Sequence, residues 1–211
     1  MPAQIFPTKG NLMNIKKSLA LAKLGYDLLD RKRNILVREM MELISSAEEI
    51  QNKINETYLE AYRALQNANI TLGLVADTVS SFPYDDTLQI DYRSVMGVEL
   101  PVIRIDKEQN GDKPERPVYS LMATNSQFDD AYLAFVRVKR LTVLMTQVET
   151  SIYRLANAVK KTQKRSNALQ NIIIPNFEAN IVFITNYLAE KEREEFSRLK
   201  IVKAGKLEHN V

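Results

Sequence analysis

The sequence predicts a mainly α-helical protein: a long antiparallel two-helix coiled coil formed by the N- and C-terminal helices, with a small β-hairpin insert between them. Two apolar heptad tracts lie near the two ends of the chain, a β-like segment separates them, and glycine and proline number only 6 and 7 in 211 residues. A 3-4 spacing sustained over many turns keeps one seam of a helix facing a partner helix. At 1.5 Å per residue each tract would run on the order of 100 Å, so we expect a rod.

The first helix is predicted over residues 11–80, after an extended lead-in over residues 1–10, with Thr8 or Asn11 as the N-cap. Its a and d positions fall at 12, 15, 19, 22, 26, 29, 33, 36, 40, 43, 47, 50, 54, 57, 61, 64, 68, 71, 75 and 78. Sixteen of these twenty are apolar; the exceptions are Arg33, Thr57, Thr71 and Thr78. We expect Arg33 either to extend its charge outward or to pair with an acid of the seam.

The insert is predicted over residues 81–127. Phe82-Pro83-Tyr84 should end the first helix, because proline lacks the N–H that a helix needs. Apolar residues then alternate with polar ones over 98–105, which is the period of a strand. Asn110-Gly111 is a favourable turn dipeptide, and 117–122 is the predicted return strand.

The second helix is predicted over residues 128–200, kinked near Pro175, and a basic tail over 201–211 is expected to fray. Its seam consists of Ala134, Val138, Leu141, Met145, Val148, Ile152, Leu155, Val159, Leu169 and Ile173. Beyond Pro175 the apolar spacing changes to 4-4-3-4, which relaxes a left-handed supercoil.

The charge distribution predicts the register of the two helices. Residues 1–38 carry eight basic and two acidic side chains, and residues 137–170 carry eight basic and one acidic. If the chain folds as a hairpin whose ends meet, residue 12 faces the region near 196 and residue 78 the region near 130. The basic segments then lie beside acidic ones, namely Glu39, Glu42, Glu48, Glu49, Glu56 and Glu60, and Glu190, Glu192, Glu194 and Glu195. Complementary charges of this kind set orientation in coiled coils.

Several kinds of chemistry have no candidate residues. The chain has no cysteine and a single histidine, His209, so neither a catalytic triad nor a two-histidine metal site can be assembled. It also has no glycine-rich phosphate loop. No signal peptide or uncharged apolar stretch of about 18 residues is evident. We therefore expect a non-enzymatic chain without a metal, a cofactor or a membrane span, located in the cytoplasm or peripheral to a membrane.

Four segments resemble the D subunit of V-type and A-type ATPases. They are Pro7–Leu12 continued by Leu24–Arg33, Ser94–Pro101, Arg165–Leu169 continued to Ile174-Pro175, and Phe196–Lys200. The matches occur in order and cover about residues 7 to 203, whereas the residues after about 204 resemble nothing in this family.

This resemblance implies a central-stalk rotor shaft that transmits torque between an ATP-hydrolysing or ATP-synthesising hexameric ring and a membrane ion-translocating ring. Both termini would insert into the hexameric ring of catalytic and regulatory subunits. The insert end would contact the small F subunit and the funnel-shaped coupling subunit on the membrane rotor. Nucleotide would be bound by the neighbouring subunits, and the transported ion, a proton or sodium, by others.

The resemblance also suggests two sets of contact residues. Candidates for the contact with the hexameric ring are Lys9, Lys16, Lys17, Lys23, Arg165, Arg198, Lys200 and Lys203. Candidates for the contact with the small subunit or the membrane side are Ala64, Ala68, Gly73, Val95, Met96, Gly97, Val98, Leu100 and Pro101. Each lysine taken singly is equally well interpreted as a solvated helix residue.

Two other functions remain open at this point. One is a non-motor coiled-coil scaffold or adaptor, which would form homo-oligomers through its seam. The other is a basic coiled coil that binds nucleic acid, whose binding would weaken steeply with salt. The register interpretation of the basic segments is preferred to nucleic-acid binding, and the strand-like insert favours the rotor over a plain scaffold.

Overall fold

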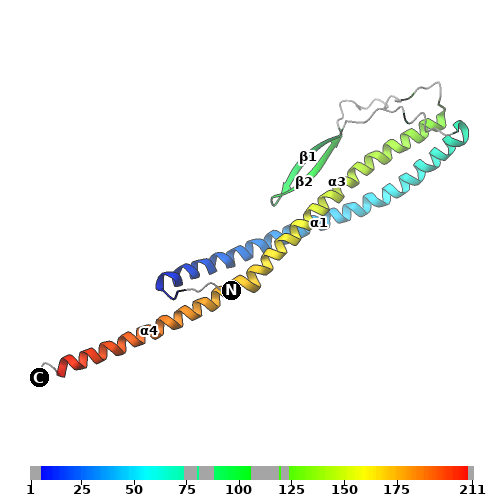
Figure 1. Cartoon of the computed structure of the whole chain (residues 1–211). Helices are drawn as coiled ribbons and strands as arrows, with labels where there is room; N and C mark the ends of the chain where they lie inside the picture. Colours follow the sequence, from blue (N-terminus) through cyan, green and yellow to red (C-terminus); the bar gives the residue numbers. More distant parts are fainter. Residues whose placement is uncertain (1–5, 74–79, 81–87, 106–118, 120–123, 209–211) are drawn as a thin grey trace. The chain divides into compact units, whose positions relative to one another are not determined.

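The computed structural model describes residues 6–73, 80, 88–105, 119 and 124–208. Its elements are α1 (Lys9–Leu72), β1 (Leu88–Val95), β2 (Val98–Ile105), α3 (Ser126–Ala168), the π-helix η2 (Leu169–Ile173) and α4 (Ile174–Glu208), shown in Figure 1. An N-terminal helix and a long C-terminal helix with an antiparallel hairpin between them confirm the predicted fold class. The chain divides into two compact units: unit 1 (residues 1–34 and 160–211) and unit 2 (residues 35–159).

Helix α1 begins where its cap predicts. Thr8 Oγ1 accepts a hydrogen bond of 3.2 Å from the N–H of Asn11, which satisfies one of the free donors at the helix start. The heptad assignment is confirmed, because every a and d side chain from 12 to 68 is buried or half-buried. The end predicted at residue 80 stays a prediction, because Ser80 is helical and residues 74–79 lie outside the described part of the chain. Helix α1 ends at Leu72 because Gly73 adopts a left-handed φ of 77° and closes the last turn on the carbonyl of Asn69. Residues 74–79 and 81–87 lie outside the described part of the chain.

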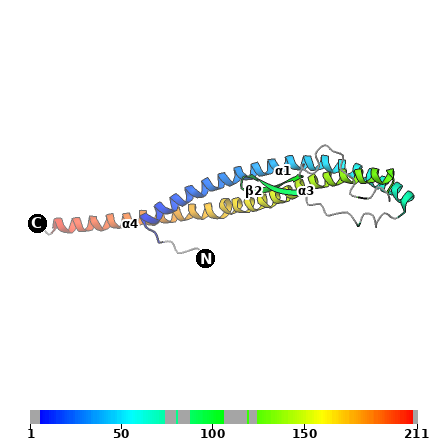
Figure 2. The same ribbon diagram turned by 90° about the horizontal axis from the view of Figure 1, so that it is seen from above.

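In unit 1, α1 runs antiparallel to α4, as Figures 1 and 2 both show. Lys9 pairs with Glu192 at 3.0 Å and Lys23 with Glu178 at 2.8 Å, so an ion pair with the 190–195 acidic cluster is confirmed. The predicted alignment is shifted, however. A register that places residue 12 opposite 196 would place Lys9 opposite residue 199 instead of 192. The difference is one heptad, because the apolar seam repeats every seven residues and allows both alignments.

The irregularity expected near Pro175 is a π-helix. The N–H of Ile174 donates to the carbonyl of Leu169, five residues back, and the helix continues through Pro175. This wider turn moves the seam from the expected Ile173, which is exposed, to the half-buried Ile174. A 3-4 spacing then resumes at 177, 181, 184 and 188, so the apolar shift is absorbed locally. The bend expected here stays a prediction.

Helix α4 continues to Glu208, and the fraying expected from residue 201 stays a prediction. The segment 201–208 contains no proline, and its single glycine, Gly205, weakens a helix without ending it. Residues 209–211 lie outside the described part of the chain.

In unit 2, the two strands form an antiparallel hairpin that differs from the predicted one. Leu88 pairs with Ile105 and Val95 with Val98, so the turn is Met96-Gly97. Both turn residues have positive φ, 50° and 76°, as a tight two-residue hairpin turn requires. The predicted tip, Asn110-Gly111, and the predicted return strand 117–122, apart from Tyr119, lie outside the described residues; β2 pairs with β1.

The packing of the hairpin on the helices centres on one buried side chain of β2. Leu100 is 2% exposed and contacts Leu36 of α1 and Leu155 of α3, both fully buried. A second cluster joins Ala68 of α1 to Phe128 of α3, with Tyr119 packed edge-on against Phe128. Unit 2 therefore holds its helix pair together at two levels, and the hairpin covers one of them.

One helical stretch, Ser126–Lys203, contains an 18-residue window of mean hydropathy 1.2. By length and composition alone, this window is apolar enough to cross a membrane, which is weak evidence for a span. The absence of a membrane span stays a prediction.

Candidate functional surfaces

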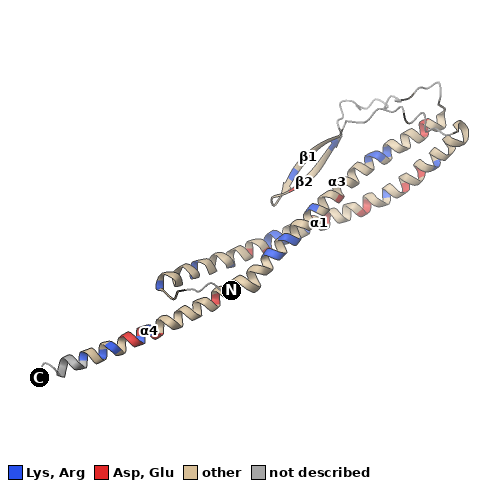
Figure 3. Cartoon of the chain, viewed as in Figure 1, with Lys and Arg blue, Asp and Glu red and all other residues tan. Residues whose placement is uncertain are grey.

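The eight cationic candidates all lie in unit 1, on α1 or on the helix formed by α3, η2 and α4 (Figure 3). Five of them have exposed side chains and no ion-pair partner within the described part of the chain. These are Lys16, Lys17, Arg165, Arg198 and Lys203. They are the members of the set best placed to meet a partner protein.

The other three cations make intramolecular contacts. Lys9 and Lys23 form the interhelical ion pairs of unit 1, and the Lys200 ammonium lies 5.3 Å from the centre of the Phe196 ring. The hydrogen bond to Glu192 raises the pKa of Lys9, and the charge of Glu192 adds to it. Lys9 and Lys23 therefore each form an ion pair between the two helices of unit 1.

The same unit exposes large apolar side chains that sequence reasoning missed. On α1 Leu21 is 69% exposed, and on α4 Phe183 is 58% exposed. The full set is Phe6, Met13, Leu21, Leu24, Leu28, Ile172, Ile173, Val182, Phe183, Tyr187, Phe196, Leu199, Ile201 and Val202. The signal was the presence of apolar residues outside the predicted seam positions, to which only Ile173 of this set had been assigned. The candidate surface of unit 1 is thus mixed, apolar and cationic, and not simply basic.

The second candidate set lies in unit 2, and several of its members are buried within this chain. Ala68 and Leu100 are 0% and 2% exposed, and Pro101 is also buried. Ala64 packs against the Ala68 cluster, and Val95 and Val98 pack against the Leu100 cluster. Small residues of α1 therefore serve close packing inside this chain. The exposed members are Gly73, Met96 and Gly97; as contacts to a partner they stay predictions.

The hairpin presents an apolar row that was not predicted. Leu88, Ile90 and Tyr92 of β1 are 41%, 59% and 58% exposed. Gln89 and Asp91 alternate with them, so the period of two in this segment was the available signal.

Polar contacts from both helices fasten the hairpin. Arg93 of β1 pairs with Glu39 of α1. The backbone N–H of Ile103 donates to Gln147 Oε1 of α3 at 2.9 Å. These contacts orient the hairpin against the helix pair.

The described residues hold no cluster of three or more side chains suited to a metal ion. Asp129 lies in the first turn of α3 and accepts a hydrogen bond of 2.5 Å from Tyr119 Oη. Asp129 therefore has a structural role, and an acid in the first turn also suits the helix dipole.

Comparison with known proteins decides the family. The profile of the family described as the D subunit of ATP synthase matches residues 11–204. The chain belongs to the ATP synthase D-subunit family. The D subunit of the V-type ATP synthase of Thermotoga neapolitana is 43% identical over 201 residues, which cover 94% of this chain and 97% of the relative. The D subunit of the A-type ATP synthase of Thermococcus kodakarensis is 36% identical, with 94% and 92% covered. That of Methanopyrus kandleri is 33% identical, with 93% and 84% covered.

The match to this family includes every element described above, both helix segments of unit 1 and the hairpin of unit 2. The four segments that resemble the D subunit in sequence lie almost wholly within it. The match ends at residue 204, where the resemblance also ends.

Proposed function

We propose that this D subunit is the central-stalk rotor shaft of a rotary V-type or A-type ATP synthase. It transmits torque between the hexameric ring and the membrane ion-translocating ring. Membership of the D-subunit family carries the proposal. The helix pairing supports it, because a shaft needs two chain segments held side by side, and ion pairs join the two helices of unit 1.

The chain is a non-catalytic subunit in this proposal. Nucleotide is bound by neighbouring subunits of the ring, and no cofactor is bound by this chain. Its partners are the catalytic and regulatory subunits of the ring, the small F subunit and the funnel-shaped coupling subunit. As part of this complex it lies on the cytoplasmic side of the membrane, peripheral to it.

Unit 1 is the part of the chain that enters the ring. The exposed cations Lys16 and Lys17 and the exposed apolar side chains of α1 and α4 face the ring subunits. The exposed row of β1 and the Met96-Gly97 turn face the F subunit or the coupling subunit.

The first experiment is an affinity pull-down of the tagged chain from solubilised native membranes. Recovery of two large nucleotide-binding subunits with a small subunit, and ATP hydrolysis by the eluate, supports the rotor. Recovery of homo-oligomers alone contradicts it and favours a scaffold.

The second experiment tests the surface. Charge reversal of Lys16, Lys17 and Lys200 together should weaken assembly with the ring. The matched control reverses Lys53 and Arg63, exposed cations of α1 in unit 2, and should leave ring assembly unchanged. Equal assembly of both variants would remove the basic surface from the proposal.

A further inference from the structure

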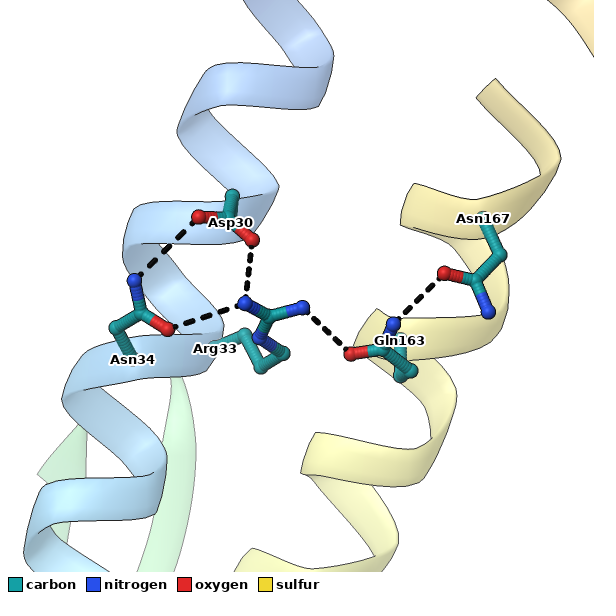
Figure 4. A network of polar contacts seen from close by, with 5 residues as sticks. All are labelled: Asp30, Arg33, Asn34, Gln163 and Asn167. Carbon is teal, nitrogen blue, oxygen red and sulfur yellow. Dashed lines mark hydrogen bonds and ion pairs between the residues drawn. The ribbon is translucent and has the colours of Figure 1, made fainter. Parts of the chain in front are cut away.

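A polar network crosses the helix pair of unit 1 at the one charged position of the described apolar seam of α1. Figure 4 shows its five residues, Asp30, Arg33 and Asn34 of α1 and Gln163 and Asn167 of α3. We propose that this network is the register lock of the chain: it selects one alignment of the two helices among those that the heptad repeat allows.

The Arg33 guanidinium is at the centre of the network. Its Nη1 donates to Gln163 Oε1 across the helix pair at 2.8 Å, and its Nη2 contacts Asp30 Oδ1 at 2.7 Å. The Arg33 side chain is only 29% exposed, so these acceptors replace water that the guanidinium would otherwise bind. The interaction across the helices is therefore specific in position as well as favourable.

Each partner of Arg33 is held in turn by a residue four positions on. Asn34 Nδ2 donates to the second oxygen of Asp30, Oδ2, at 3.4 Å. Gln163 Nε2 donates to Asn167 Oδ1 at 2.7 Å, which leaves Gln163 Oε1 as the acceptor for Arg33. The side-chain amide of Gln163 thus has one orientation that satisfies both neighbours.

Apolar packing cannot fix the alignment at this level. Between Val159 and Leu169 the buried seam positions of the second helix are Thr162 and Ser166, 6% and 1% exposed. Small hydroxyl side chains pack without the knob shape of leucine or isoleucine. A polar seam residue is a known means of specifying register at a cost in stability.

A slip of one heptad would break the network in either direction. In one direction Ala156, which has no side-chain acceptor, would take the place of Gln163. In the other, Gln170 would take its place, but the residue four positions on is Ile174 and not an asparagine. A half-buried guanidinium or amide would then lack a partner, a larger penalty than the loss of an exposed ion pair.

The two ion pairs of unit 1 are too exposed to act alone. Lys9 and Glu192 are 78% and 63% exposed, and Lys23 and Glu178 are 55% and 50% exposed. Pairs of this kind contribute little and are screened by salt. They agree with the register, whereas the Arg33 network selects it.

The test uses the absence of cysteine from the whole chain. Lys23→Cys with Glu178→Cys reports the native register, because these two residues pair in the structure. Lys23→Cys with Asn171→Cys or with Thr185→Cys reports a slip of one heptad, about 10 Å along the helix. A short bifunctional maleimide cross-links whichever pair of cysteines is close. Only the gel band of the monomer is scored, so that cross-links between two chains are not counted.

Replacement of the lock by Arg33→Leu with Gln163→Leu should raise the ratio of slipped to native cross-links at least about tenfold, or about 1.4 kcal/mol. The matched control, Arg31→Leu with Lys164→Leu, removes exposed cations outside the network and should keep the wild-type ratio. A ratio equal to the control's would overturn the proposal. If the double variant does not fold, Arg33→Met alone, which retains an unbranched apolar stem, is scored by the same ratio.

Discussion

Arg154 of α3 donates a hydrogen bond of 3.0 Å to the backbone carbonyl of Glu99 on β2, and its guanidinium lies 5.4 Å from the centre of the Tyr92 ring on β1. A single side chain of the helix pair therefore contacts both strands. Because a two-stranded hairpin is marginally stable by itself, such contacts decide whether it stays in place.

Arg154→Met should loosen the hairpin while the helices persist. The substitution keeps an unbranched apolar stem but removes a hydrogen bond of about 0.5–1.5 kcal/mol and a cation–π contact of about 0.5–1 kcal/mol. Hydrogen exchange of the β1 and β2 amides should become faster in the variant, with helical circular dichroism unchanged. Lys53→Met, at an exposed position of α1, is the control. Unchanged strand protection would show that the other contacts, such as those of Leu100 and Arg93, hold the hairpin without Arg154.

Leu155→Ala should reduce the stability of the fold more than Leu144→Ala on the same helix. Leu155 is fully buried between Leu36 and Leu100, so its truncation leaves a cavity and should reduce the free energy of unfolding by about 2–5 kcal/mol. Leu144→Ala on the same helix is the control, because Leu144 is 46% exposed. Chemical denaturation followed by circular dichroism measures both. Equal losses in the two variants would contradict the assigned core.

Two glycine-to-alanine substitutions should change the stability of the protein in opposite directions. A Cβ at Gly25 would lie 3.9 Å from Leu169 Cδ1, an ordinary contact, so Gly25→Ala should stabilise the helix by about 1 kcal/mol. Gly97 has a φ of 76°, so Gly97→Ala should destabilise the hairpin by roughly 1–2 kcal/mol. Thermal unfolding of the two variants measures the difference. A destabilised Gly25→Ala variant would mean that the seam tolerates no added methyl group there.

Stability should fall as the pH rises above about 10. Burial raises the pKa of Tyr119 above its usual value of 10.0, and the hydrogen bond to Asp129 adds to this shift. Above pH 10 the unfolded chain releases the phenolic proton while the folded chain keeps it, so the unfolded state binds fewer protons and stability decreases with pH.

Tyr119→Phe should remove this part of the pH dependence. The free energy of unfolding, measured by denaturation from pH 8 to 11, should decrease less steeply in the variant than in the wild type. Lys9 contributes in the same direction, since its raised pKa stabilises the fold only while it stays protonated; Lys9→Met in both backgrounds separates the two. Equal slopes with and without Tyr119 would refute its titration as the cause.

The apolar pattern of the sequence was sufficient to predict both long helices and their buried faces. Every a and d position of α1 from Leu12 to Ala68 is at least half-buried, because a 3.5-residue period leaves only one stripe that a partner helix can cover. The polar residues before α1 predicted the Thr8 cap, and the alternating pattern of 98–105 predicted strand β2. The family resemblance, carried by short segments in the right order, was also confirmed.

The candidate surfaces were predicted less well. The cations of unit 1 are exposed as expected, but Ala68 and Leu100 are buried within the chain. Sequence reasoning could not separate a small residue that seats a partner protein from one that seats Phe128, because both require the same absence of side-chain volume.

What the sequence determined by itself is periodic and local: the helices, their seams and the Thr8 cap. Tertiary structure decided three other features: which heptad of α1 lies opposite which heptad of the C-terminal helix, the Met96-Gly97 turn and the π-helix before Pro175. A heptad repeat is unchanged by a shift of seven residues, a strand can pair with more than one neighbour, and an extra residue in a helix can be absorbed in more than one way. Only contacts between distant residues, such as Arg33 with Gln163, distinguish these alternatives.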